Sequence, residues 1–154
     1  MNAFLLIADP PAEPMPAEVE PGAHVRRVVL GSRSPRRAAA WYRRALGLPE
    51  AETSVLAGDE ALTAGVVELV ITYRSHVSAA AVEPVRAVLN FVVDDIRAIE
   101  ARLVAMEAVW VRELERTPWG IIGTVLDVDG NYVQIIEPIR GTSPGTADDW
   151  EEYR

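Results

Sequence analysis

The sequence predicts an α+β fold in which one pattern, β-α-β-β-β, is used twice. Three observations predict it: a repeated order of strand and helix patterns, helix-start signals after the first strand of each half, and short apolar runs broken by Gly and Asp after each helix. The two modules span residues 23–75 and 86–140, and residues 76–85 connect them. An internal repeat of this size suggests that the modules complete one another's sheet.

In the first module, a predicted strand at residues 25–32 precedes a helix at residues 34–48. Ser34 is a candidate N-cap, the following proline suits the first helical position, and Gly47 stops the helix. The predicted buried stripe of this helix consists of Ala38, Trp41, Tyr42 and Leu46. The strands predicted after it are SVLAG (54–58), EALTAG (60–65) and VVELVITYR (66–74).

The second module opens with a strand at residues 87–95, which ends in an Asp cap for a helix at residues 96–106. One face of this helix is apolar and consists of Ile96, Ile99, Leu103 and Met106. Three further strands are predicted, AVWVREL (108–114), IIGTVLDV (121–128) and YVQIIEP (132–138). Between the last two, DVDGN (127–131) is expected to make only a turn.

Strand alternation predicts which side chains face away from the helices. In the opening strand of the second module, the larger apolar set should meet the helix, which leaves Asn90 on the opposite, concave side. By the same alternation, Arg27 and Val29 face that side in the first module. In the last strand, Tyr132, Gln134 and Ile136 share one face.

The charge of the chain is concentrated outside the two modules. The formal net charge is −8, but removing a Pro/Glu-rich arm at residues 1–22 and an acidic tail at residues 141–154 leaves 15 acidic and 14 basic residues. A near-neutral body without a basic stripe argues against nucleic-acid binding. Whether Trp150 and Tyr153 of the tail dock on the body or a partner stays open.

The residue inventory restricts both the location and the chemistry. No apolar run approaches the roughly 20 residues that cross a bilayer, and the opening residues do not resemble a secretion signal, so we expect a cytoplasmic protein without a membrane partner. The sequence has no Cys and no Lys, which excludes disulfides, thiolate chemistry and Schiff-base chemistry. The only histidines are His24 and His76.

Four stretches together resemble the vicinal oxygen chelate superfamily, which contains glyoxalases, bleomycin resistance proteins and extradiol dioxygenases. They are WYRRALGL, GDEALTAGVVELVI, NFVVDDIRAIEARL and PWGIIGTVLDVDGNYVQIIEP, and in order they cover roughly residues 24–138. The resemblance implies paired βαβββ modules whose strands curl into a mixed-sheet cup, and a homodimer that often completes the pocket.

In metal-using members of the superfamily, the first and last strands of each module carry the metal ligands. The resemblance places these positions on Arg27, Glu68, Val88 and Gln134 of this sequence. One carboxylate and one amide beside a guanidinium and a valine do not make a divalent-metal site. Using His24 instead would turn Arg27 toward the core, so we reject that register. We therefore expect neither a metal nor a cofactor.

Two polar pairs are expected on the cup floor, and each has a structural alternative. Arg27 and Glu68 either help to bind a ligand or form an ion pair across the sheet. Asn90 and Gln134 either present amides to a polar ligand or belong to a hydrogen-bond network of the sheet. Both alternatives stay open at this point.

Aromatic and basic residues are candidates for the rim of the cup. Trp110 and Arg112 are expected to share a strand face, Trp119 stands at the turn before the next strand, and Tyr132 lies beside Gln134. An aromatic rim suits a flat ligand that stacks. For Trp110 and Trp119 the alternative is packing in the core, the hairpin or a dimer seam.

The resulting hypothesis is a metal-free protein that binds a small molecule, such as an antibiotic or another aromatic metabolite, in the manner of bleomycin resistance proteins. The alternatives are a metal-dependent lyase, isomerase or dioxygenase, a metal-free enzyme with Glu68 as general base, and an accessory protein that only dimerises or docks. The sequence does not identify the ligand or decide whether any catalysis occurs.

Overall fold

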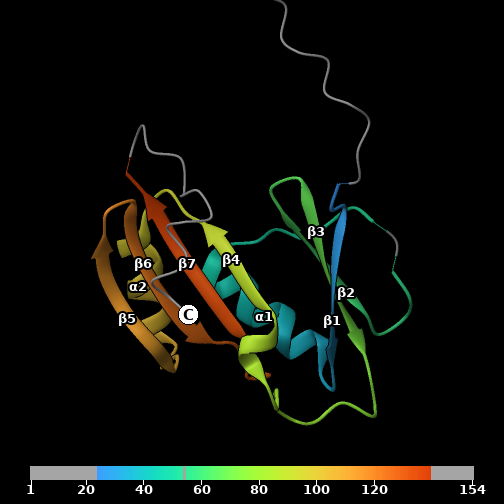
Figure 1. The fold of residues 1–154 in the computed structure, drawn as a ribbon. Coiled ribbons are helices and arrows are strands. Elements are labelled where there is room, and N and C mark those ends of the chain that lie inside the picture. Colours follow the sequence, from blue (N-terminus) through green and yellow to red (C-terminus); the bar gives the residue numbers. More distant parts are fainter. Residues whose placement is uncertain (1–23, 54, 140–154) are drawn as a thin grey trace, which may run out of the picture.

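The computed structural model describes residues 24–53 and 55–139 of the chain. Its first sheet has the strand order β1-β3-β2, formed by β1 (Arg27–Ser32), β2 (Glu60–Ala64) and β3 (Val67–Tyr73). Strand β1 runs parallel to β3, and β2 runs antiparallel to it. Helix α1 (Pro35–Leu46) lies between β1 and β2 in the chain (Figure 1). The predicted arm at 1–22 and the predicted tail with Trp150 and Tyr153 lie outside the described residues.

The second sheet has four strands in the order β4-β7-β6-β5. A short 3-10 helix η1 (Pro84–Arg86) leads into β4 (Val88–Val92), and helix α2 (Ile96–Ala105) follows. The remaining strands are β5 (Trp110–Thr117), β6 (Gly120–Leu126) and β7 (Tyr132–Pro138). Strand β4 is parallel to β7, whereas β6 is antiparallel to both of its neighbours. Two mixed sheets with few helices confirm the predicted α+β class.

One predicted strand of the first module is wrong. Residues 55–58 form coil and a turn instead of a strand: Gly58 adopts a positive φ of 91°, and the Leu56 side chain is 79% exposed. The edge of β2 is covered by an earlier segment, in which Glu50 makes an isolated bridge with Leu62. The backbone N–H of Thr63 also donates to the oxygen of Pro49 at 2.9 Å.

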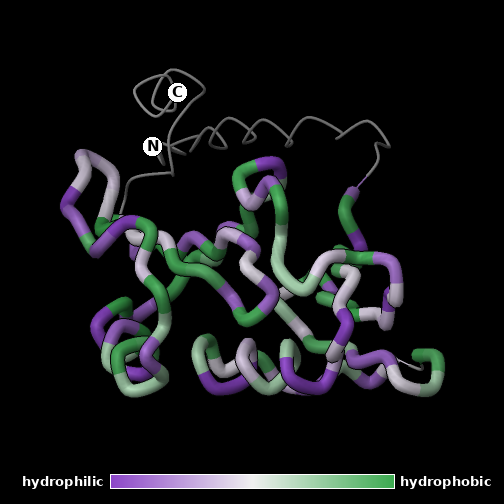
Figure 2. Tube along the Cα trace, turned by 90° about the horizontal axis from the view of Figure 1, so that it is seen from below, coloured by the Kyte–Doolittle hydropathy of each residue, from purple (hydrophilic) through white to green (hydrophobic). Residues whose placement is uncertain are grey.

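The two sheets also remain separate within one chain, whereas the repeat suggested that the modules complete one another's sheet. Among the described residues, no backbone ladder joins β1 or β3 to any strand of the second sheet. The modules are joined instead through their helices, which lie on the same side of the strands (Figures 1 and 2). Strands β1 and β4 are consequently edge strands.

The helices and the sheets share one hydrophobic core. The predicted stripes are confirmed: Ala38, Trp41 and Tyr42 of α1 and Ile96, Ile99 and Leu103 of α2 are buried, while Leu46 and Met106 pack at the edge of the core. From the strands, the core takes Leu69, Ile71, Val125, Val133 and Ile135. Because both modules contribute to a single core, neither buries its apolar surface alone.

The helix ends follow the sequence signals with one exception. Helix α1 begins at Pro35 and ends at Gly47, which adopts the left-handed conformation with φ 72°. In α2, the Asp95 carboxylate accepts a hydrogen bond from the Ala98 N–H at 2.9 Å, as predicted. Ser34 occupies the N-cap position of α1, but its side chain makes no cap bond, and the hydroxyl of buried Ser32 accepts the Ser34 N–H at 2.9 Å instead.

A buried hydrogen bond links α1 to the turn between β6 and β7. The Tyr42 hydroxyl donates to Oδ2 of Asp127 at 2.7 Å, and both side chains are buried. Oδ1 of Asp127 accepts the backbone N–H groups of Asp129 at 2.8 Å and Asn131 at 2.9 Å. The predicted turn is therefore confirmed, and it also clamps the two modules together.

The environment of Tyr42 keeps its hydroxyl protonated. Burial, and then the Asp127 carboxylate, raise the pKa of the Tyr42 hydroxyl well above its usual value. The protonated hydroxyl therefore remains a donor at neutral pH.

No described helix has the length and hydropathy needed to cross a membrane.

We predict that Tyr42→Phe lowers the free energy of unfolding by about 1–3 kcal/mol, because it removes one donor from a buried carboxylate. Urea denaturation followed by circular dichroism measures this change. Tyr73→Phe is the matched control, since Tyr73 is 55% exposed and its loss should cost less than about 0.5 kcal/mol. Equal stability of the two variants would show that the buried bond contributes nothing.

Candidate functional site

The surface of interest is the side of both sheets that does not face α1 and α2, here called the helix-free face. Strand pairing confirms the predicted alternation, because residues opposite one another in a ladder share a face. The helix-free face carries Arg27, Val29 and Glu68 on the first sheet, and Val88, Asn90, Val92, Tyr132, Gln134 and Ile136 on the second.

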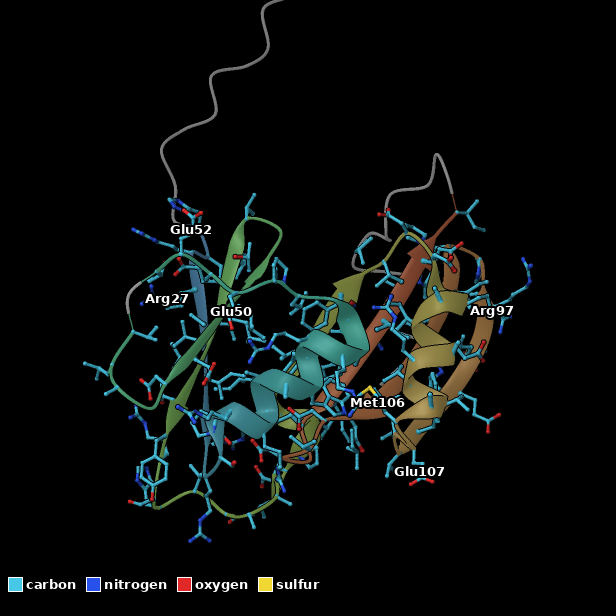
Figure 3. The ribbon with its side chains drawn as sticks, turned by 180° about the vertical axis from the view of Figure 1, so that it is seen from behind. Arg27, Glu50, Glu52, Arg97, Met106 and Glu107 are labelled. Carbon is cyan, nitrogen blue, oxygen red and sulfur yellow. The ribbon has the colours of Figure 1, made fainter. Side chains whose placement is uncertain are left out.

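Arg27 and Glu68 face one another across β1 and β3. Nε and Nη2 of Arg27 donate to Oε2 of Glu68 at 2.9 and 2.6 Å. The other carboxylate oxygen, Oε1, accepts the hydroxyl of Thr53 from the loop before β2. Figure 3 shows Arg27 at the end of the first sheet where Glu50 and Glu52 also lie, and these glutamates line a shallow pocket with Thr53 and Glu68.

The contacts of Glu68 make it a poor general base. The hydrogen bonds from Thr53 and then from Arg27 lower the pKa of Glu68 below its usual value. A carboxylate that removes protons near neutral pH instead needs a raised pKa. Both Glu68 oxygens are also already engaged. The geometry is that of an ion pair that holds a loop to the sheet.

Asn90 and Gln134 form the second pair, on β4 and β7. Nδ2 of Asn90 donates to Oε1 of Gln134 at 2.9 Å. Asn90 is exposed and Gln134 is half-buried. The pair begins a polar row across the whole sheet, because Thr124 lies opposite Gln134, and Arg112 lies opposite Thr124. The sequence therefore predicted both polar pairs of the helix-free face.

The prediction that Trp110 and Arg112 share a strand face is wrong. Trp110 lies opposite Val125 and Arg112 lies opposite Thr124, so a bulge at Val111 shifts the alternation between them. Trp110 packs against the common core, where Gly123 leaves room for its ring: a Cβ there would lie 3.0 Å from it. Arg112 stays on the helix-free face and forms an ion pair with Glu115.

The other two aromatic candidates differ in exposure. Trp119 is only 7% exposed and packs with Ile122 and Ile136 in a small cluster on the helix-free face. Tyr132 is half-buried and lies opposite Val88 and Leu126. Trp119 thus packs in the hairpin, which was the structural alternative, and Tyr132 lies beside the Asn90–Gln134 pair.

Sequence reasoning missed two polar residues that contact or extend the pairs. Thr53 reaches Glu68 from a loop, and no local pattern points to such a contact. Thr124 follows from the same strand alternation that selected Gln134, since it lies opposite Gln134 on β6. The sequence also contained a signal for the packing of Trp110. A glycine in the middle of a strand, here Gly123, often marks a place where a neighbouring group approaches closely.

The residues at the superfamily's metal positions do not fit a divalent ion. In the structure Gln134 lies opposite Asn90, two residues along β4 from the expected position Val88, so we consider Asn90 in place of the valine. The donor set becomes one guanidinium, one carboxylate and two amides, and Arg has no lone pair to offer. His24 and His76 are exposed, and the described residues contain no group of three His, Asp or Glu side chains that could hold a metal ion.

An apolar cleft of about 490 Å³ lies between the edge strands β1 and β4. Among the described residues that line it, only Asn90 carries a polar side chain. The others are Val25, Val28, Leu48, Ala64, Gly65, Val67, Leu69, Val88, Leu89, Phe91 and Val92. The cleft therefore offers apolar surface and unpaired strand edges and carries no charge.

Several solved structures share this fold. TioX from Micromonospora sp. ML1 is 21% identical, and the match covers 76% of this chain and 100% of that one with a TM-score of 0.59. TnmS3, an antibiotic binding protein from Streptomyces sp. CB03234, is 20% identical over 76% of this chain and 97% of its own, with a TM-score of 0.60. Lactoylglutathione lyase from Agrobacterium tumefaciens is 21% identical over 77% and 96%, with a TM-score of 0.58. At these identities the likeness establishes the fold alone.

No curated protein matches the chain. The sequence profile of the Glyoxalase/Bleomycin resistance protein/Dioxygenase superfamily matches residues 24–135, which is well over half of the chain and includes both modules. The two mixed sheets, the repeated strand–helix order and the profile agree with the resemblance in the sequence. The chain therefore belongs to the Glyoxalase/Bleomycin resistance protein/Dioxygenase superfamily.

Proposed function

We propose that this protein binds a small molecule without a metal ion and that it does so as a homodimer. The observation that carries the proposal is the replacement of a metal-binding donor set by two side-chain pairs, Arg27 with Glu68 and Asn90 with Gln134. The ion pair is neutral as a whole, and the amide pair retains hydrogen-bonding atoms. This chemistry suits non-covalent binding.

The class of ligand is an antibiotic or another aromatic metabolite. The support is that TnmS3, which shares the fold, is an antibiotic binding protein. On this chain, exposed valines at positions 29, 88 and 92 surround the polar pairs of the helix-free face. Apolar walls with a few placed polar groups are typical of small-molecule sites.

The enzymatic alternatives receive less support from the described residues. A lyase, isomerase or dioxygenase of the metal-dependent kind needs ligands that the four strand positions do not supply. A metal-free enzyme with Glu68 as base needs a carboxylate with a raised pKa, whereas the Glu68 pKa is lowered. The proposal therefore assigns no catalytic residue.

The homodimer follows from the two edge strands. Strands β1 and β4 each pair on one side only within the described chain, and neither edge carries a Pro, a Lys or a bulge. Val25, Val29, Val88 and Val92 are exposed along them, and the apolar cleft lies between them. A second copy related by a two-fold axis satisfies both edges at once, β1 with the partner's β4 and the reverse.

This arrangement unites the two polar pairs in one site. In a single chain, Arg27 with Glu68 and Asn90 with Gln134 belong to separate sheets. Pairing of β1 with the partner's β4 makes one seven-stranded sheet, and both pairs then occupy its helix-free face.

We also propose that the protein is cytoplasmic.

We expect protein purified without a chelator to contain far less than one equivalent of Ni, Zn, Mn or Fe by elemental analysis. Screening a library of aromatic natural products by thermal shift and Trp fluorescence should give saturable binders. Their affinities should change less than about twofold in excess EDTA, because no ion takes part. A stoichiometric metal, or affinities that collapse in EDTA, would defeat the metal-free proposal, and the absence of any binder would defeat the binding function.

We expect size-exclusion chromatography with light scattering to give twice the chain mass of 16.8 kDa. Val92→Lys should shift the protein toward the monomer, because it places a charge on the edge that the second copy covers. Val104→Lys on the outer side of α2 is the matched control, since the two valines are equally exposed, at 63% and 62%. A wild-type protein that remains monomeric at all concentrations would contradict the dimer.

A further inference from the structure

We infer that the ligand is a neutral molecule with a carboxamide, lactam or imide group, and that Asn90 and Gln134 together recognise this group. The inference rests on the proposed binding function and deepens it by naming the chemistry of the ligand. It starts from the hydrogen-bonding atoms that the pair leaves unused after its own 2.9 Å bond.

After its own hydrogen bond the pair still presents both acceptors and donors. The bond from Nδ2 of Asn90 to Oε1 of Gln134 leaves the Asn90 carbonyl oxygen and the Gln134 amide nitrogen for other partners, together with the second N–H of Asn90 and the second lone pair of the Gln134 oxygen. Turning both amides over reverses the bond and leaves the Asn90 nitrogen and the Gln134 oxygen. Either orientation offers donors together with acceptors, which is what the N–H and C=O groups of an amide require.

The surroundings of the pair favour an uncharged ligand. Val88 and Val92 flank Asn90 on β4, and Tyr132 and Ile136 flank Gln134 on β7. No charged side chain lines the cleft at which Asn90 stands. Arg112, farther along the same polar row, is already paired with Glu115. A ligand that buries a charge beside the amides would therefore lose its hydration without gaining a counter-ion of its own.

The charged side chains of Arg27 and Glu68 on the first sheet do not change the expectation of an uncharged ligand. Arg27 and Glu68 bind one another at 2.6 Å, and Thr53 occupies the remaining carboxylate oxygen. In the proposed dimer this neutralised pair lies on the same face as the partner's amide pair. The polar part of the recognition therefore depends on the two amides.

Related ligand groups satisfy the pair less well than an amide does. An ester has no N–H, so the acceptor of the pair would be buried without a partner. A carboxylate offers acceptors only and adds a charge, which makes it the worst of the three. A site built around hydrogen bonds discriminates strongly against analogues that lack one of them.

The test uses three probes with one ring system: 2-naphthamide, methyl 2-naphthoate and 2-naphthoate. Isothermal titration calorimetry of the full-length protein should give an affinity for the amide at least about tenfold above that for the ester, with the carboxylate weakest. Asn90→Leu removes the outward acceptor of Asn90 at nearly the same volume and leaves the Gln134 amide nitrogen as a donor. It should reduce amide binding about tenfold and leave ester binding within about threefold.

Glu100→Gln is the control variant, because Glu100 lies on α2 and forms an ion pair with Arg97, which Figure 3 shows pointing away from the strands. It should bind all three probes as the wild type does. Thermal unfolding of each variant confirms that it is folded before binding is compared.

The outcomes separate the inference from the proposed function. Amide preference that disappears in Asn90→Leu supports the inference. Equal binding of amide and ester in the wild type overturns it and leaves the binding function intact. Failure of all three probes overturns it as well, and the natural-product screen then decides the binding function on its own.

Discussion

The hydrogen bond between the Tyr42 hydroxyl and the Asp127 carboxylate is the constraint on which the two-module arrangement depends. Asp127 is buried, so its carboxylate needs the hydrogen-bond donors that surround it. The same carboxylate holds the β6–β7 turn through the N–H groups of Asp129 and Asn131. Since this turn sets how β7 pairs with β6, a contact made by the first module's helix fixes the position of Gln134 in the second.

Each module places a polar pair on its first and last strands, and the two pairs are chemically different. The first sheet has the ion pair of Arg27 and Glu68, with Thr63 opposite Glu68 on the next strand. The second has the amides of Asn90 and Gln134, with Thr124 beyond them. The first and last strands of each module thus carry polar groups that pair with one another.

The apolar cleft and the two edge strands both favour association with another chain. Unpaired strands with exposed valines are prone to aggregate in solution unless something covers them. A second copy that covers both edges removes this liability and also brings the ion pair and the amide pair onto one sheet. In this proposal, association and ligand binding depend on the same strands. Residues along β1 and β4 therefore influence both properties.

Local sequence patterns determined most of the fold. Strand alternation and helix periodicity identified all seven strands and both α-helices of the described residues, and the face on which Arg27, Asn90 and Gln134 lie followed from the alternation alone. The pairs themselves were predictable because each joins two strands whose faces were already assigned. Only the tertiary structure decided where a bulge turns Trp110 away from Arg112, which loop residue reaches Glu68, and how Tyr42 meets Asp127. These contacts join residues distant in sequence or interrupt a regular strand, so no local period encodes them.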